Sequence, residues 1–387
     1  MQATAPASDR IWSQGANMKN EMNDNNEKIK VGDSRIIEFN EKLRESRNQY
    51  KQGGRSDYDI SRYELIDYEF KDGGKKRVYK NLNFSIFVDD YCNADCKFCV
   101  AQLRYHHRNE LYHKCHIGDP DKYLSRLEDV LKIVRPLNPS VSLTGGEPTL
   151  SPLLTEVLKL VDKYGFRKRT ITTNGSGLLK VQDNDIILNN LIKYNWNHLN
   201  ISRVSPDDSI NRAIMNYSTD SEYCDMNMLK EILDICAEST LKHRLSCLLL
   251  KECVHDVEGI KNYADILSQS GANNFIFREL MDYDKLAVNT EKTEYCNQNK
   301  VKLYDIWHQF QDYPEFIPYL NILGYYYYVE IYKYHNMTIA SETADLNLQS
   351  KEKAAHPDVV YEMIFHTSGH LTGSWVEKEE ILDRYTE

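Results

Sequence analysis

The feature that most constrains this chain is an alternation of short apolar runs and longer amphipathic segments over residues 81–281. The apolar runs have the length and the β-branched or aromatic content of buried strands. The segments between them repeat apolar residues at helical spacing. The expected strands are 83–88, 140–144, 169–173, 198–202, 244–250 and 274–280, and the expected helices are 122–134, 153–165, 185–195, 228–240 and 257–271.

Strands that alternate with helices in this way predict a parallel sheet with right-handed crossovers, and thus an α/β fold. Two architectures satisfy the pattern: a doubly wound sheet, and a barrel that is complete or partial. In both, the residues that carry chemistry lie at the carboxyl ends of the strands. The search for a site therefore concentrates on those ends.

The flanking segments differ from this central pattern. Residues 1–57 are polar and predict a partly disordered leader with one helix over 34–50. Residues 283–387 predict a helix over 300–313 and two hairpins, with turns at His335-Asn336 and Ser368-Gly369. The expected division is a leader, a core over 58–282, and a C-terminal extension of one helix and antiparallel β-structure.

Composition excludes several classes of protein. The net charge of -10 argues against a broadly basic surface, so we expect neither nucleic acid nor a membrane surface as a partner. The sequence has no apolar run long enough to span a bilayer, and its beginning lacks the apolar region of a secretory signal. We therefore expect a cytoplasmic protein, in which clustered cysteines more often bind metal than form disulfides.

Three of the nine cysteines, Cys92, Cys96 and Cys99, fall within the stretch "YCNADCKFC". An iron–sulfur cluster held by three thiolates would leave one iron open to another ligand. A zinc site would need a fourth ligand, and a redox Cys-x-x-Cys pair would leave Cys92 unused. The histidines that could complete a zinc site are His106, His107, His113 and His116.

The spacing "CNADCKFC", with Phe98 before the last cysteine, resembles the signature of the radical S-adenosylmethionine (radical SAM) enzymes. It follows the first predicted strand, and the second ends in "SLTGGEPTL", which is similar to the Gly-Gly-Glu-Pro segment of that family. The resemblance covers residues 82–281. It implies a partial (β/α)6 TIM-like barrel, here with a C-terminal antiparallel β-rich extension, and one 4Fe–4S cluster on the three cysteines.

The resemblance also implies contacts to S-adenosylmethionine. Gly145 and Gly146 would let the ligand approach the backbone, and Glu147 would accept a hydrogen bond from its amino group. Several of the other implied residues have ordinary alternative roles, in turns, in helix caps or in the core. These implied contacts are Phe98, Thr173, Asn174, Ser202, Arg203 and Arg212.

By the same resemblance, reductive cleavage of S-adenosylmethionine would yield a 5′-deoxyadenosyl radical, with flavodoxin or ferredoxin as electron donor. We expect a small, anionic or nucleotide-like substrate that is modified, cyclised or rearranged. The alternative is maturation of a ribosomally made peptide. The segment "FIFRELMD" is distantly similar to the cyclase of molybdenum-cofactor synthesis, but Cys296 is the only cysteine after Cys253, so a second cluster is not expected.

Substrate contacts are predicted in two places. Arg278 and Glu279 follow one another near the end of the sixth strand, so at most one faces inward, and an ion pair that holds the barrel end is the alternative. The basic segment 103–116 predicts a pocket wall for an anion or, alternatively, a solvated helix. Its candidate residues are Arg104, His106 and His107, with Cys115 as a candidate hydrogen-atom donor.

Overall fold

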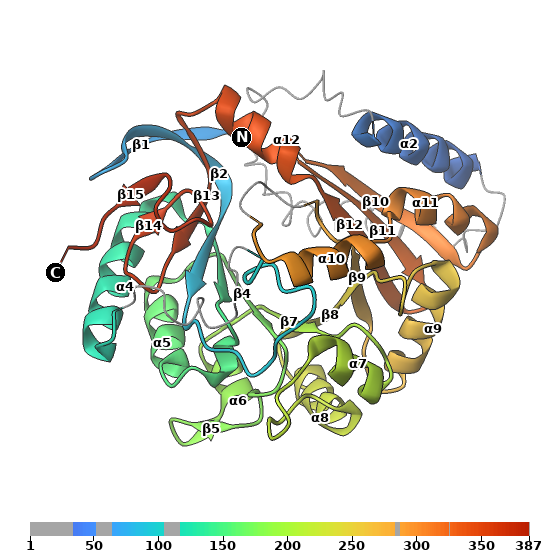
Figure 1. Cartoon of the computed structure of the whole chain (residues 1–387), viewed down its shortest axis with the longest axis horizontal. Helices are drawn as coiled ribbons and strands as arrows, with labels where there is room; N and C mark the ends of the chain where they lie inside the picture. Colours follow the sequence, from blue (N-terminus) through green and yellow to red (C-terminus); the bar gives the residue numbers. More distant parts are fainter. Residues whose placement is uncertain (1–33, 52–63, 104–116, 283–286, 325, 387) are drawn as a thin grey trace.

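The computed structural model describes residues 34–51, 64–103, 117–282, 287–324 and 326–386, and the side chains of 34–39 and 51 are not described. Its centre is a run of parallel strands that confirms the predicted α/β fold (Figure 1). These strands are β2 (Gly74–Phe87), β3 (Ser140–Thr144), β4 (Lys168–Thr173), β7 (His198–Ser202), β8 (Lys242–Leu248) and β9 (Asn274–Arg278).

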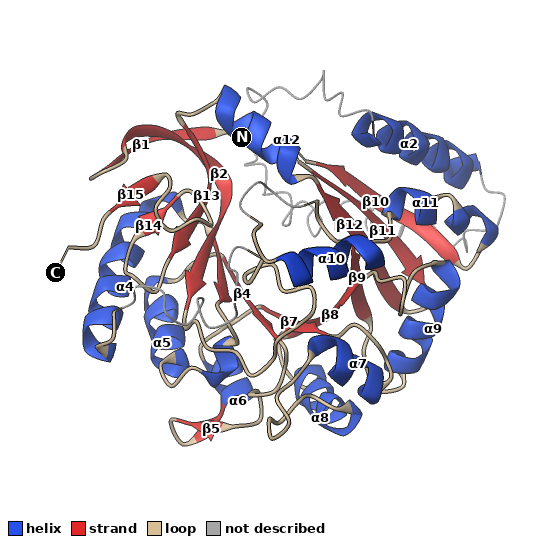
Figure 2. Ribbon diagram, in the orientation of Figure 1, coloured by secondary structure: helices blue, strands red, loops and turns tan. Residues whose placement is uncertain are grey.

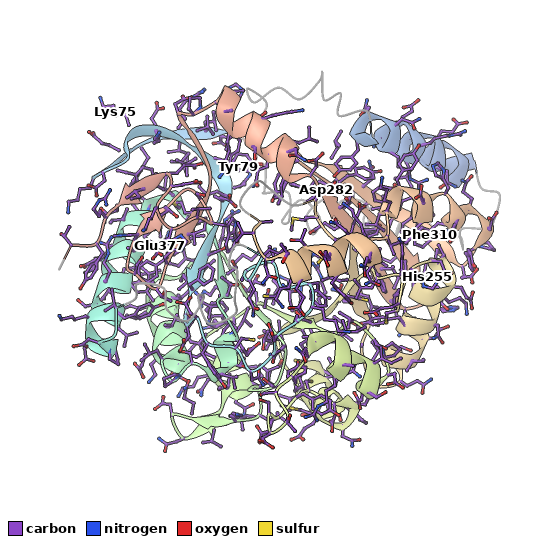
Figure 3. All side chains as sticks on the ribbon, in the orientation of Figure 1. Lys75, Tyr79, His255, Asp282, Phe310 and Glu377 are labelled. Carbon is purple, nitrogen blue, oxygen red and sulfur yellow. The ribbon has the colours of Figure 1, made fainter. Side chains whose placement is uncertain are left out.

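Helices cover the outer side of this sheet, which Figure 2 shows as an arc. They are α4 (Pro120–Val134), α5 (Leu154–Tyr164), α6 (Ile187–Lys193), α7 (Asp208–Met215), α8 (Met226–Ala237) and α9 (Val257–Ser268). Side chains alternate along each strand. In β8, Leu245 and Cys247 are buried in the core shared with the helices, whereas the alternating Arg244 and Ser246 are only half-buried. Figure 3 shows side chains filling the layer between sheet and helices.

The C-terminal hairpins form as predicted, but they do not make one appended unit. The first, β11 (Tyr327–Tyr334) and β12 (Met337–Ala344), joins β9 through parallel pairing of β12, with β10 (Phe316–Leu323) beyond it. The second, β13 (Val359–Phe365) and β14 (Leu371–Thr372), joins β2 at the opposite edge, followed by β15 (Ile381–Asp383). All described strands except β5 and β6, which pair with each other, thus belong to one sheet whose order runs from β10 to β15.

Other elements depart from the sequence-based expectation. β2 begins well before the predicted residue 83, because its first half pairs with β1 (Leu65–Phe70). The predicted helix over 300–313 is divided into α11 (Leu303–Trp307) and the 3-10 helix η4 (Gln309–Asp312). Three of the described α-helices were not predicted: α7, α10 (Thr290–Asn299) and α12 (Leu346–Ala355). The remaining short elements are the 3-10 helices η2 (Arg135–Leu137) and η3 (Pro148–Leu150) and the strands β5 (Val181–Gln182) and β6 (Asp185–Ile186).

The helix predicted within the leader is present as α2 (Ser34–Lys51), and it packs against the C-terminal sheet. The Arg47 guanidinium donates to both carboxylate oxygens of buried Glu330 in β11, at 2.6 and 2.8 Å. Tyr50 stacks on Tyr328, and Leu43 is buried. Residues 34–51 therefore belong to the folded body. In the described part of the chain, no helix combines the length and the apolar content needed to span a membrane.

Candidate active site

The three cysteines lie in a loop over residues 88–103 that leaves the carboxyl end of β2, and we call it the cysteine loop. All three are free thiols with part-buried side chains. Cys92, Cys96 and Phe98 pack against an apolar cluster from other segments. The buried members of that cluster are Ala94, Val204, Ile214, Met215, Tyr217, Leu250, Leu280 and Cys296.

Burial raises the pKa values of two thiols in this loop. It raises the pKa of Cys96 well above the usual range, and the neighbouring Cys99 and Cys92 raise that pKa further. Burial also raises the pKa of Cys99. Metal binding would displace the thiol protons, because a coordinating sulfur is a thiolate.

The donor set suits a cluster rather than a single ion. In the described part of the chain, no three histidine, cysteine, aspartate or glutamate side chains are grouped so as to hold one metal ion. A cubic cluster has a different requirement, because each thiolate ligates its own iron. Three free thiols on one loop are the type of ligand that a 4Fe–4S cluster takes. The histidines of the zinc alternative lie outside the described residues.

The glycines that follow β3 pack against the cysteine loop. A Cβ on Gly145 would lie 2.2 Å from the carbonyl oxygen of Asp89, and one on Gly146 would lie 2.1 Å from that of Tyr91. Gly146 N and Glu147 N also donate to these two oxygens, at 2.9 and 2.7 Å. The missing Cβ atoms therefore make room for the loop backbone, and the predicted approach of a ligand to these two glycines stays a prediction.

Glu147 is likewise turned into the protein. Its side chain is 2% exposed. Oε1 accepts from Thr149 N (2.9 Å), Thr149 Oγ1 (2.6 Å) and Thr173 Oγ1 (2.5 Å), and Oε2 accepts from Asn174 N (2.6 Å). Burial raises the pKa of Glu147, and these hydrogen bonds oppose the rise. The carboxylate joins the ends of β3 and β4, and its predicted contact with an ammonium group stays a prediction.

The predicted Asn174 connects β4 to the cysteine loop. Its Nδ2 donates to Asn93 Oδ1 at 2.9 Å, and its Oδ1 accepts from the hydroxyl of Ser176 at 2.6 Å. Asn93 in turn donates to Ser176 Oγ and to the carbonyl of Glu222. Asn174 and Thr173 are both buried, so their side chains serve this network rather than an open pocket.

Three of the predicted S-adenosylmethionine contacts lie at the end of β7 or after it, and their side chains differ in exposure. Arg203 is 1% exposed. Its guanidinium donates to the carbonyls of Cys224 and Pro206 and pairs with Asp208 at 2.5 Å, so it already has internal partners.

The other two are less enclosed. Ser202 is half-buried at the end of β7. Arg212 in α7 lies over the Tyr223 ring and donates to the carbonyl of Thr219.

Arg278 and Glu279 have partners on different segments, as their adjacent positions required. The Arg278 guanidinium donates to Ser246 Oγ in β8 and to Glu342 Oε1 in β12, both at 3.0 Å. Glu279 instead accepts from Leu303 N at 3.0 Å, and burial raises its pKa. The predicted alternative, an ion pair at the barrel end, is present between Arg278 and Glu342.

Arg278 belongs to a polar surface that we call the inner face, the side of the parallel strands opposite the helices. Hydrogen bonds link its members across strands, such as Asn83 to Ser142 (2.9 Å) and Arg244 to Asn274 (3.3 Å). The inner face comprises Asn83, Ser85, Ser142, Thr172, His198, Asn200, Ser202, Arg244, Ser246, Asn274 and Arg278.

This inner face is electropositive over β8 and its neighbours. Burial and the charge of Arg278 lower the pKa of Arg244 to about 10, which leaves it protonated at neutral pH. Burial, with the charges of Lys168, Arg244 and Lys242, lowers the pKa of His198 to about 3. Sequence analysis missed Arg244, although its alternation with Leu245 and Cys247 was visible in "HRLSC".

A second missed residue is Lys292 in α10. Its side chain is 8% exposed, and its ammonium donates to Asp95 Oδ1 at 3.0 Å and to the Cys96 carbonyl at 2.6 Å. Cys296, one turn further along α10, belongs to the apolar cluster beside the cysteines. Little in the sequence of α10 suggested this contact, because few of its residues are apolar.

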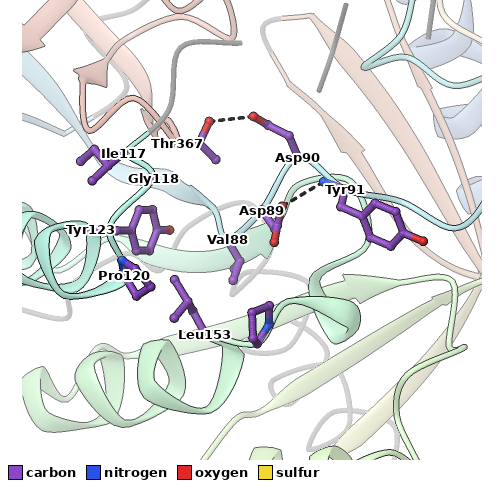
Figure 4. A pocket seen from close by; sticks show the side chains of 11 residues that line it. Val88, Asp89, Asp90, Tyr91, Ile117, Gly118, Pro120, Tyr123, Leu153 and Thr367 are labelled. Atoms are coloured by element: carbon purple, nitrogen blue, oxygen red, sulfur yellow. Dashed lines mark hydrogen bonds between the residues drawn. The ribbon is translucent and has the colours of Figure 1, made fainter. Parts of the chain in front are cut away.

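A cavity of about 340 Å³ lies beside the first residues of the cysteine loop, 88–91 (Figure 4). Pro120 and Tyr123 of α4, Leu153 and the loop residues Asp89 and Asp90 line it. Thr367 donates to Asp90 Oδ2 at 2.8 Å, which attaches the end of β13 to the loop. None of the three cysteines lines this cavity.

Four predicted residues fall outside the described residues, and their predictions stay as they were. They are Arg104, His106, His107 and Cys115.

Comparisons with known proteins agree with this geometry. Residues 86–264 match the family model described as the Radical SAM superfamily. The chain is 25% identical over 235 residues to the S-adenosylmethionine-dependent nucleotide dehydratase of Flammeovirga pacifica, covering 57% of this chain and 73% of that protein. It is 34% identical over 95 residues to a probable GTP 3′,8-cyclase of Saccharolobus islandicus, covering 23% and 26%.

Among solved structures, the chain is similar to SuiB of Streptococcus suis bound to its precursor peptide SuiA. The TM-score is 0.48 and the identity 14%, covering 94% of this chain and 73% of that one.

Proposed function

Because this chain belongs to the radical SAM superfamily and is a radical SAM enzyme, we propose that it abstracts a hydrogen atom from a small, anionic, nucleotide-like substrate bound on the inner face. The observation that carries the proposal is the pair of half-buried arginines, Arg244 and Arg278, on that face of an otherwise acidic chain. A fixed guanidinium fork matches a phosphate or carboxylate group.

We assign one 4Fe–4S cluster to Cys92, Cys96 and Cys99. When bound, the cluster supplies the electron that cleaves S-adenosylmethionine and so generates the 5′-deoxyadenosyl radical. The chain's own residues exclude water from the thiols with the apolar cluster and hold the loop through Gly146, Glu147 and their partners. Among the predicted S-adenosylmethionine contacts, half-buried Ser202 is the one on the inner face.

The names of two relatives support the substrate class. One is called a nucleotide dehydratase and the other a probable GTP cyclase, so both are named for nucleotide substrates. Arg278 would position an anionic group through the guanidinium edge that its bonds to Ser246 and Glu342 leave accessible. A cytoplasmic location and reduction by a flavodoxin or ferredoxin complete the proposal.

The test is release of 5′-deoxyadenosine by the anaerobically reconstituted enzyme. We expect nucleoside mono-, di- or triphosphates to stimulate release above the substrate-free rate, and the free nucleoside to stimulate it much less. Equal stimulation by the neutral nucleoside would contradict anion recognition. Stimulation by a short peptide alone would support the peptide-maturase alternative.

Two variants separate the inner face from general charge effects. Arg244→Met with Arg278→Met should lower nucleotide-stimulated release at least tenfold and leave substrate-free release in place. Arg77→Met is the matched control, because Arg77 pairs with Asp358 at the amino end of β2, away from this surface. Loss of stimulation in the control as well would refute the assignment.

A further inference from the structure

Helix α10 lies against the cysteine loop, although it stands outside the segment that matches the family (Figure 1). The backbone N–H groups of Val288 and Asn289 donate to the carbonyl of Leu103, at 2.8 and 3.0 Å. The Asn289 side chain caps the helix by accepting from Lys292 N at 3.1 Å. These contacts fix the position of the first turn of α10, which carries Lys292.

Lys292 places its charge beside a predicted cluster ligand. Its ammonium lies 2.6 Å from the Cys96 carbonyl and 3.4 Å from that of Asp95, and it pairs with the Asp95 carboxylate at 3.0 Å. The lysine side chain is 10% exposed and that of Asp95 27%. Water therefore screens the carboxylate more than the ammonium, so the carboxylate cancels only part of the ammonium's field at the loop.

Stability alone is a poor reason for this arrangement. A buried ion pair often contributes little compared with apolar residues of similar volume, because both charges lose solvation. The apolar cluster that contains Cys296 already supplies such an environment at this face of α10. A charge retained there needs a partner whose own charge changes, and an iron–sulfur cluster becomes one unit more negative on reduction.

We propose that Lys292 is a positioning residue that orders the cysteine loop and raises the reduction potential of the cluster by holding a positive charge next to Cys96. The inference rests on the cluster assignment proposed above. It requires no change in the protonation of any group. Cluster potentials depend on nearby charge, hydrogen bonding and solvent exposure, and Lys292 supplies the first two.

The experiment is a potentiometric titration of the reconstituted cluster, followed by electron paramagnetic resonance, with iron and sulfide counted per chain. In Lys292→Met we expect the ratio of reduced to oxidised cluster at a fixed poise to fall at least tenfold, which is 59 mV for one electron. Lys292→Arg keeps the charge and should stay near wild type. Lys302→Met, the control, removes an exposed lysine near α10 and should also stay near wild type.

Asp95→Asn separates charge from structure. It removes the negative partner of the same pair, so its potential should move upward, opposite to Lys292→Met. Parallel shifts of the two variants in the same direction, or a wild-type potential in a Lys292→Met protein with full iron content, would overturn the inference. A wild-type chain without iron and sulfide would overturn the proposed function as well, so the two failures are distinguishable.

Discussion

The cysteine loop follows the carboxyl end of β2 and the inner face lies along the parallel strands, and the two regions are built in opposite ways. Around the loop, Gly146, Glu147 and Asn174 are engaged by other parts of the chain. On the inner face, Arg244 and Arg278 are half-buried and hydrogen-bond to side chains of neighbouring strands. Most of the recognisable motif thus constructs the loop, and the residues of the proposed substrate site lie outside the motif.

The largest expected effect comes from closing the space between the loop and β3. Gly146→Ala places a Cβ about where the Tyr91 carbonyl oxygen lies, so the loop must move. We expect a loss of about 3 kcal/mol in the free energy of unfolding and loss of the bound iron. Urea unfolding and iron analysis measure both. Gly118→Ala is the control, since its Cβ would meet nothing within 4 Å. If Gly146→Ala were as stable as wild type and kept its iron, the described packing of the glycine against the loop would be contradicted.

Two arginines give the most direct contrast between the regions. Arg203→Met leaves the Asp208 carboxylate without its guanidinium partner and should lower the free energy of unfolding by about 3 kcal/mol. Arg278→Met removes a more exposed pair and should cost about 1 kcal/mol or less, yet raise the KM for the nucleotide. Unfolding curves and steady-state kinetics of both variants decide the matter. A reversed order, with Arg278 governing stability, would show that the inner face is structural.

The central β-strands were predictable because short apolar runs rich in β-branched and aromatic residues are typical of buried strands. The edges of the sheet were not predictable. Both hairpins were visible at His335-Asn336 and Ser368-Gly369, but which edge each joins depends on contacts distant in sequence, such as β12 with β9. Helix α10 was missed because only Lys292 and Cys296 are buried along it, so no apolar periodicity marks it.

For the site, the cysteines, the glycines and Glu147 were found from their spacing, and the ligand contacts expected of Gly145, Gly146 and Glu147 stay predictions. Their nearest neighbours are the loop backbone and the end of β4 rather than open space. A motif records which residues are required, and it does not distinguish a residue that touches a ligand from one that holds the residue that does.

A smaller effect is expected at the carboxylate that joins β3 to β4. In Glu147→Gln, the amide would turn a donor toward Asn174 N or toward the threonine donors on the other oxygen. We expect a loss of about 2 kcal/mol in unfolding free energy. Glu156→Gln, on the exposed side of α5, should change stability by less than about 0.5 kcal/mol. Equal stabilities of the two variants would contradict the buried network.

The smallest effect concerns pH and the positive inner face. His198 has a folded pKa lowered from 6.5 to about 3, so between these values the unfolded chain binds the extra proton. Stability from this group is therefore complete above pH 6.5 and is lost as pH falls. The unfolding midpoint of His198→Asn should depend less on pH than that of wild type between pH 7 and 5. Identical pH profiles would contradict the lowered pKa of His198, whose first cause is burial.

The central claim is that Cys92, Cys96 and Cys99 hold a cluster with one iron left for S-adenosylmethionine. The direct measurement is iron and acid-labile sulfide per chain after anaerobic reconstitution, with the electron paramagnetic resonance spectrum of the reduced protein before and after S-adenosylmethionine is added. The account predicts about four of each per chain, a spectrum that changes on addition, and neither iron nor signal in Cys96→Ala. A colourless wild-type protein, or one that binds zinc in place of iron, would contradict it.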